Sequence, residues 1–143
     1  MPIAFWRDEY ITGEQEIDTQ HQILFSIINE LHDAMISGEG REILGKTLDK
    51  LATYTSEHFV TEEALMEKYE YPNIVLHKQK HRELREDVLT LQKLFKEKEK
   101  FLTVKVSQFM TDWLIHHIKG EDLKMINFIK ENRNYHQKFP TDK

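Results

Sequence analysis

The 143-residue chain contains no cysteine, few glycines and prolines, and no apolar run as long as a membrane-spanning helix needs. The missing cysteines exclude disulfide frameworks, thiolate metal sites and cysteine nucleophiles. Basic residues are not in excess either. The formal net charge of −5 argues against nucleic acid as a partner, because phosphate binding needs a basic surface. The first residues lack the basic and apolar regions of a secretory signal, so we expect a cytoplasmic protein that does not bind membranes.

The scarcity of glycine and proline leaves long uninterrupted segments that are typical of helices. Four segments carry core positions at alternating spacings of three and four residues, which indicates helices packed nearly antiparallel. They cover about 18–35, 41–69, 73–97 and 102–119, with Gly120 as the expected stop of the last. The sequence shows no sustained alternation of apolar and polar residues with a period of two, so no strand is predicted. The prediction is one all-α domain over 1–143: an up-down-up-down antiparallel four-helix bundle at about 18–120, an N-terminal arm 1–17, and a short extra helix in the tail 121–143.

Histidines interrupt the core positions of all four predicted helices. Five of the eight histidines, and one glutamate four residues after a histidine, fall on these positions: His21, His58, Glu62, His77, His81 and His117. A buried carboxylate or unpaired imidazole is costly unless something satisfies it. A single core histidine, such as His21 taken alone, is more often a hydrogen-bonded structural residue. His32 lies too far along the helix axis to join the others, so we expect a partly buried structural residue near the bundle end. Convergence from four helices instead predicts a metal site, because imidazole nitrogen and carboxylate oxygen are metal ligands.

The kind of ligand narrows the choice of metal. Sulfur donors are absent, and the histidines outnumber what one tetrahedral zinc ion usually takes. Histidines with bridging carboxylates inside a bundle favour two first-row ions, iron above all, with manganese as the alternative. No histidine follows a glutamate by three residues, as in ferritin-like di-iron proteins, so the site is rich in histidine rather than in carboxylate.

These residues stand in four motifs whose order and spacing are familiar. They are Ile-Asp-Thr-Gln-His at 17–21, His-Phe-Val-Thr-Glu-Glu at 58–63, His-Lys-Gln-Lys-His at 77–81, and Trp-Leu-Ile-His-His-Ile-Lys-Gly-Glu-Asp at 113–122. From about Phe5 to Asp122 the chain resembles the hemerythrin family, in particular its single-domain bacterial members, and every ligand position of the family pattern is filled.

The resemblance implies a pair of iron ions with a bridging hydroxide or oxo group. His77, His81 and His117 would bind one iron, and His21 and His58 the other, which keeps an open position. Glu62 and Asp122 would bridge the two ions. Asp122 enters only through the resemblance; we expect a frayed helix end past Gly120 to turn its carboxylate inward. An apolar oxygen pocket would be lined by Leu24, Trp113, Leu114 and Ile118, although ordinary core packing explains the same residues.

The leading hypothesis is therefore reversible dioxygen binding for carriage, storage or delivery, with nitric oxide and azide-like anions as further ligands. The alternatives are an oxygen or redox sensor that acts through a separate partner, and a di-iron oxidase or peroxidase. The core positions offer no additional acid or basic residue for turnover, which favours a binding protein over an enzyme. No extended apolar surface is evident, so the expected state is a monomer, and the sequence identifies no partner protein.

Overall fold

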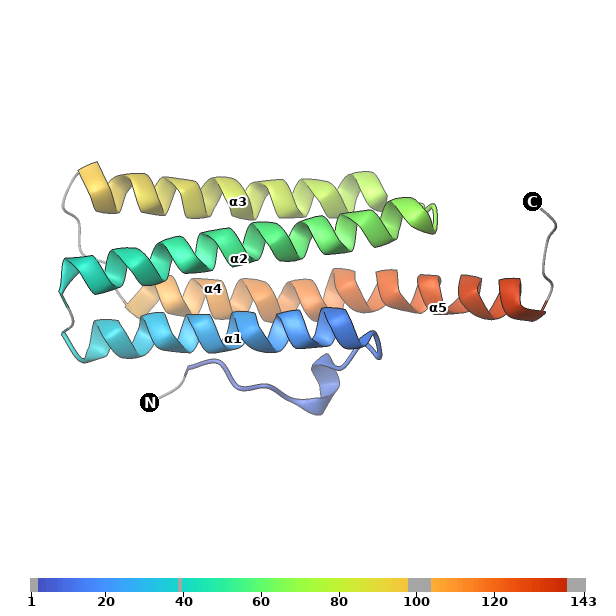
Figure 1. The fold of residues 1–143 in the computed structure, drawn as a ribbon, viewed down its shortest axis with the longest axis horizontal. Helices are drawn as coiled ribbons and strands as arrows, with labels where there is room; N and C mark the ends of the chain where they lie inside the picture. The colour runs from blue at the N-terminus through green and yellow to red at the C-terminus, as the bar shows by residue number, and fades with distance from the viewer. Residues whose placement is uncertain (1–2, 39, 98–103, 139–143) are drawn as a thin grey trace.

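The computed structural model describes residues 3–38, 40–97 and 104–138, and within these ranges it is helical without strands (Figure 1). The elements in chain order are the 3₁₀ turn η1 (Asp8–Tyr10), α1 (Gln15–Ile36), α2 (Arg41–Lys68), α3 (Ile74–Glu97), α4 (Val104–His117), the π-helical turn η2 (Ile118–Asp122) and α5 (Leu123–Lys138). The predicted all-α bundle with a C-terminal helix is confirmed. The predicted connection around 98–101 lies outside the described residues.

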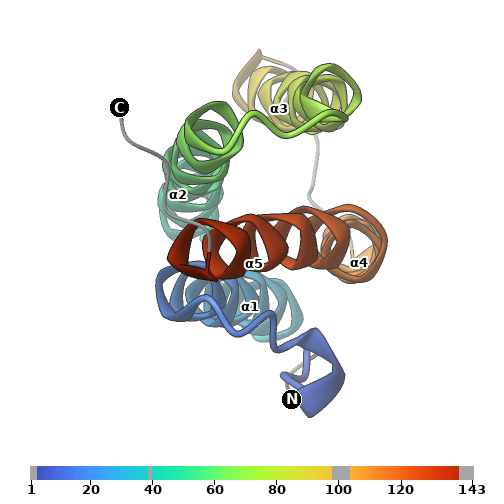
Figure 2. The same ribbon diagram turned by 90° about the vertical axis from the view of Figure 1, so that its right-hand side faces the viewer.

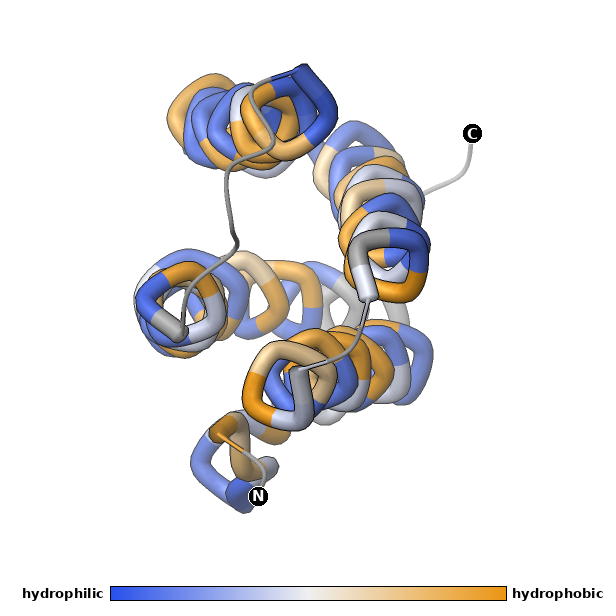
Figure 3. Tube along the Cα trace, turned by 90° about the vertical axis from the view of Figure 1, so that its left-hand side faces the viewer, coloured by the Kyte–Doolittle hydropathy of each residue, from blue (hydrophilic) through white to orange (hydrophobic). Residues whose placement is uncertain are grey.

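The four bundle helices surround one interior, with α1 against α2 and α4, and α2 against α3 (Figure 2). Each helix carries hydrophobic and hydrophilic residues on different sides of its axis (Figure 3). Apolar side chains at helical spacing therefore meet inside, and their removal from water is the main force that holds the bundle together. None of the described helices combines the length and the apolar character that crossing a bilayer would require.

Helix ends follow the local signals in most places. Gly38 takes a positive φ of 69° two residues after α1 ends at Ile36, and α2 ends at Lys68, close to Pro72. The start of α1 differs from the expected Asp18: the helix begins at Gln15. The Asp18 carboxylate instead accepts hydrogen bonds from the Thr12 and Gly13 backbone N–H groups, so this side chain fixes the preceding turn.

The expected stop at Gly120 is wrong. The chain remains helical there, and α4, η2 and α5 run on as one continuous rod (Figure 1). An isolated glycine weakens a helix but does not end it where tertiary packing holds both sides. Here Ile118 and Met125 are fully buried on either side of Gly120. The extra helix is accordingly longer than expected, with 16 residues from Leu123 to Lys138.

Two apolar clusters lie along the interior. The larger cluster contains residues from all four bundle helices, and it includes Leu24, Leu84 and Leu114. The smaller joins the first turn of α1 and the end of α2 to α5, and includes Ile17, Met66, Met125 and Ile126. The predicted polar core residues fall between these two sets in sequence: His21 between Ile17 and Leu24, and Asp122 between Leu114 and Met125. Apolar layers thus cover the polar layer on both sides along the bundle axis.

Candidate metal centre

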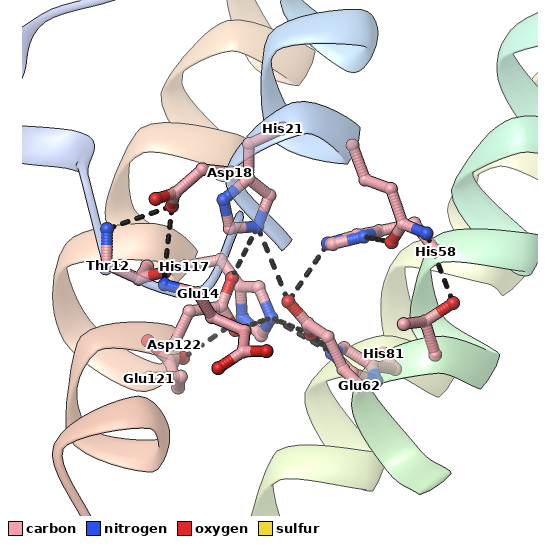
Figure 4. Close-up of polar contacts among 12 residues, drawn as sticks. Thr12, Glu14, Asp18, His21, His58, Glu62, His81, His117, Glu121 and Asp122 are labelled. Atoms are coloured by element: carbon pink, nitrogen blue, oxygen red, sulfur yellow. Dashed lines mark hydrogen bonds and ion pairs between the residues drawn. The ribbon is translucent and has the colours of Figure 1, made fainter. Parts of the chain in front are cut away.

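All seven residues predicted as ligands come together in this layer. His21 lies on α1, His58 and Glu62 on α2, His77 and His81 on α3, His117 at the end of α4 and Asp122 at the end of η2. Each has 2% or less of its surface exposed. The close-up in Figure 4 shows the side chains from α1, α2 and the α4–η2 segment pointing toward one another. Helical spacing explains two of the pairs, because residues four apart share a face.

The position of Asp122 depends on the π-helical turn. In η2 the backbone N–H of Leu123 bonds to the carbonyl of Ile118, five residues earlier. This wider turn brings residues five apart onto the same face, so Asp122 stands beside His117 rather than beyond it. The Asp122 Oδ1 atom lies 3.0 Å from His117 Nε2. The carboxylate therefore points inward because the helix widens, not because its end frays as the sequence led us to expect.

The donors divide into two groups that share both carboxylates. One group contains Glu62, His77, His81, His117 and Asp122, and the other contains His21, His58, Glu62 and Asp122. Glu62 turns Oε1 toward His81 Nε2, at 2.9 Å, and Oε2 toward His58 Nε2, also at 2.9 Å. Asp122 turns Oδ1 toward His77 Nε2 and Oδ2 toward His21 Nε2, both at 3.0 Å. Each carboxylate thus presents one oxygen to each group.

The spacing of the donors fits ligands around first-row metal ions. Two donors that each lie about 2.1 Å from the same ion, with a donor–ion–donor angle of about 90°, are about 3.0 Å apart. The contacts above have this length, and His81 Nε2 lies 2.9 Å from His117 Nε2. Two imidazole nitrogens at this distance, with carboxylates beside both, form an unusual contact for a packed core but an ordinary one at a metal.

Unpaired polar atoms lead to the same interpretation. In the described residues, all but two of the buried side-chain nitrogen and oxygen atoms without a hydrogen-bond partner belong to this layer, and they include both oxygens of Glu62 and of Asp122. Buried polar groups in folded proteins almost always have partners. These residues therefore suit a group that accepts electron pairs from all of them, and a pair of metal ions is such a group.

The two carboxylates and the imidazoles strongly perturb one another. Burial alone would lower the pKa of His21 and His77, but the close contacts and negative charges of Asp122 and Glu62 outweigh it and raise each pKa to about 9. Burial lowers the pKa of His81. Burial likewise opposes ionisation of Glu62, yet the nearby imidazoles hold its pKa well below the usual range. Without metal, the layer is held together by protons that metal ions would displace.

Two hydrogen bonds orient imidazoles from outside the layer, and neither was predicted. His58 Nδ1 donates to Gln20 Oε1 at 2.6 Å, and His81 Nδ1 donates to Glu63 Oε2 at 2.9 Å. Arg85 also donates to Glu63 Oε2. These bonds fix the tautomer in which Nε2 keeps its lone pair for a metal. Periodicity gave no signal for Gln20 or Glu63, which merely adjoin ligand positions in sequence.

The hydrogen bond from His58 to Gln20 yields a testable expectation. Replacing Gln20 by alanine removes the acceptor for His58 Nδ1, so metal affinity should fall about 10- to 100-fold, with loss first at the His21–His58 group. Iron retained in competition with a chelator measures the effect. The exposed neighbour Gln22, replaced in the same way, serves as the control and should leave retention unchanged. Equal iron retention in the Gln20→Ala and Gln22→Ala variants would contradict the expectation.

An apolar cavity adjoins the layer. It is lined by Leu24, Trp113 and Leu114, three of the four predicted pocket residues, and further by Ile28, Leu51, Thr55, Phe59, Leu84 and Met110. The fourth predicted residue, Ile118, is fully buried but does not line this cavity. Aromatic rings separate the cavity from two imidazoles: Phe59 stacks on His81 with 3.7 Å between ring centroids, and Trp113 stacks on His117 with 4.5 Å.

The histidines outside the predicted ligand set that the structure describes have separate partners. His32 is buried and its Nδ1 lies 2.7 Å from Ser107 Oγ, which agrees with a structural role. His116 is exposed and its Nδ1 donates to the carbonyl of Asp112, on its own helix. Neither contacts the metal layer.

Comparisons with known proteins agree with this geometry. A family model described as "Hemerythrin HHE cation binding domain" matches residues 12–129. The bacteriohemerythrin of Methylococcus capsulatus is 37% identical over 80% of this chain and 86% of its own length. That of Stenotrophomonas maltophilia is 31% identical over 94% and 86%. A crystal structure of wild-type hemerythrin superposes with a TM-score of 0.83 and 32% identity, covering 89% of this chain and 97% of that one.

Proposed function

Because the chain belongs to the hemerythrin family of oxygen-binding, non-haem iron proteins, we propose that it binds dioxygen reversibly at a di-iron centre, for carriage, storage or delivery. In this proposal His77, His81 and His117 hold one iron, His21 and His58 hold the other, and Glu62 and Asp122 bridge them. A hydroxide or oxo group would complete the bridge.

The observation that carries the proposal is the unequal division of donors around shared carboxylates. Three imidazoles and two carboxylate oxygens surround one position, whereas two imidazoles and two carboxylate oxygens surround the other. The second position is therefore short of one protein ligand relative to the first. Leu24, which lines the apolar cavity, comes three residues after His21 on the same helix, which supports a cavity that reaches toward this second position. An exogenous ligand would bind at this second position.

Two iron ions held there would supply the electrons that dioxygen accepts on binding and returns on release. The protein's part is to hold the geometry and to exclude water and stray protons. The cavity serves the second purpose, because its lining contains no charged group and only one side-chain hydroxyl group. The donor set supports iron over zinc, since a histidine-rich site with bridging carboxylates suits first-row ions with more than four ligands.

The test is to load the chain with Fe(II) without oxygen, admit oxygen, and record the visible spectrum before and after the gas is removed. We expect an absorption band that appears with oxygen and disappears on its removal, with two iron ions per chain by elemental analysis. A band that forms once and decays to an oxidised state that does not respond would contradict reversible binding. That outcome would favour the oxidase, peroxidase or redox-sensor alternatives.

A further inference from the structure

Thr55 lacks a hydrogen bond that three other threonines in the helices make. Thr47, Thr61 and Thr111 each donate the hydroxyl to the carbonyl four residues earlier, at 2.9, 3.3 and 2.8 Å. Thr55 is only 3% exposed, yet its Oγ1 makes no hydrogen bond. A helical threonine can choose between two rotamers, one of which reaches that carbonyl. Its unpaired state is therefore costly and suggests that the hydroxyl has a different use.

Thr55 supplies the one side-chain hydroxyl among the residues that line the apolar cavity described above. Inside that cavity, the centre of a water-sized sphere has about 10 Å³ in which to move, which is room for one very small molecule. Water needs two to four polar partners to be held in such a place, and a single hydroxyl does not provide them. An anion would lose its hydration without gaining a compensating charge. The cavity thus suits a small uncharged molecule.

Thr55 also faces a groove on the other side. Between α2 and α3 lies a groove of about 80 Å³, lined by Ala52, Thr55, Ser56, Arg85, Val88 and Leu89. Thr55 is the residue that this groove and the interior cavity have in common. Thr55 therefore stands between the two spaces, and we assign its side chain as the wall that separates them. Rotation about its Cα–Cβ bond would move the methyl and hydroxyl groups of this wall.

Arg85 and Phe59 border this wall and hold each other in place. The Arg85 guanidinium lies 5.4 Å from the centroid of the Phe59 ring, and its Nη2 donates to Glu63 Oε2 at 3.0 Å. Phe59 itself lines the cavity and stacks on His81. The position of Arg85 is thus linked to the ring that forms the inner lining, while Thr55 remains without a partner that would restrain it.

We propose that small uncharged molecules such as dioxygen reach the interior through the α2–α3 groove, pass Thr55, and reside in the cavity beside its hydroxyl before reaching the His21–His58 side. The identity of the molecule as dioxygen rests on the proposed function, but the cavity and the position of Thr55 do not. The cavity and the wall are properties of the fold, so they can be tested with a gas that does not react.

Xenon tests the site directly. Crystals of the iron-loaded full-length chain under xenon pressure should show one xenon atom in the cavity next to Thr55. Thr55→Val, which keeps the shape, should retain the xenon and raise the midpoint of thermal unfolding by about a few degrees, because a buried unpaired hydroxyl is removed. Thr111→Val, which breaks an existing hydrogen bond, should lower it. Thr55→Leu should fill the cavity and exclude xenon.

Association rates test the route. Thr55→Leu should slow oxygen association by about an order of magnitude or more, whereas Thr47→Leu, the same change on the same helix away from both spaces, should leave the rate unchanged. A second cleft, outside the cavity, is lined by Tyr71, His77 and Glu121. Xenon bound in that cleft instead, or unchanged xenon binding and rates in Thr55→Leu, would overturn the proposal. Xenon in the cavity of a protein that gives no reversible oxygen band would leave the cavity assignment standing and contradict the proposed function alone.

Discussion

Replacing Glu62 by glutamine is expected to reduce bound iron from a pair to at most about one ion per chain, and to abolish the oxygen-dependent band. Glu62 offers Oε1 to the group of three histidines and Oε2 to the group of two. Glutamine keeps the shape, but it removes the negative charge and replaces one of these oxygens with an NH₂ donor. That donor would face imidazoles whose lone pairs should point to metal, so one position loses its ligand outright.

The size of this effect exceeds that of the surrounding hydrogen bonds. Changes to groups that only orient a ligand cost about 10- to 100-fold in metal affinity, so loss of a shared ligand should cost more than about 100-fold. Iron content after gel filtration, together with calorimetric titration, measures it. Glu57→Gln on the same helix is the matched control, because Glu57 is exposed and its side chain lies outside the layer. Retention of both ions in Glu62→Gln would contradict the bridging role.

The spacing of apolar residues was enough to predict the helices, because burial dominates in a bundle of this kind. In the first segment, for example, Leu24, Ile28 and Leu31 follow one another at spacings of four and three residues, and all three are buried. The histidines broke these stripes, and that conflict between polar character and core position was the signal for the site. The same reasoning placed His32 near the bundle end, where Ser107 satisfies its imidazole.

Asp122 could not be found in this way, for a physical reason. Helical periodicity of 3.6 residues places it well away from His117, and only the wider π-turn restores a common face. Nothing in the composition of residues 118–122 specifies such a turn, which the structure shows between the buried side chains of Ile118 and Met125. Family resemblance supplied the residue, whereas the structure supplies the mechanism that turns it inward.

The orienting groups and the cavity wall were missed for another reason. Gln20 and Glu63 act through hydrogen bonds to imidazole Nδ1 atoms on neighbouring helices, and such pairing across helices leaves no periodic trace within one segment. Thr55 follows Leu51 by four residues on the buried side of its helix, where a small core residue is ordinary, so nothing in the sequence singled it out. Only the comparison with Thr47 and Thr111, which bond to their own helix, distinguishes it.

The metal-free chain is expected to lose stability as the pH rises from 6.5 to about 9. His21 and His77 have pKa values near 9 in the folded chain, raised by Asp122 and Glu62 against the effect of burial, and the ordinary value of 6.5 when unfolded. An imidazole with a raised pKa stabilises the fold fully below pH 6.5, and this contribution disappears as the pH passes the folded value. Each imidazole contributes on the order of 3 kcal/mol of unfolding free energy. The pKa of His117 is raised as well, so it acts in the same direction.

The iron-loaded chain should behave differently, because metal ions replace these protons. Because each imidazole would be neutral and bound to metal through one nitrogen, none would titrate in this interval, so the unfolding free energy should stay level or rise. The lowered pKa of His81 affects stability only below pH 6.5, and the carboxylates titrate lower still, so neither obscures the window. Urea unfolding at a series of pH values, with and without a chelator, measures both curves. His116→Gln, at an exposed imidazole, should leave the decline of the metal-free chain intact, whereas His77→Gln should make it shallower and leave the part due to His21 and His117. A metal-free chain as stable at pH 9 as at pH 6.5 would show that protons do not hold the empty layer together.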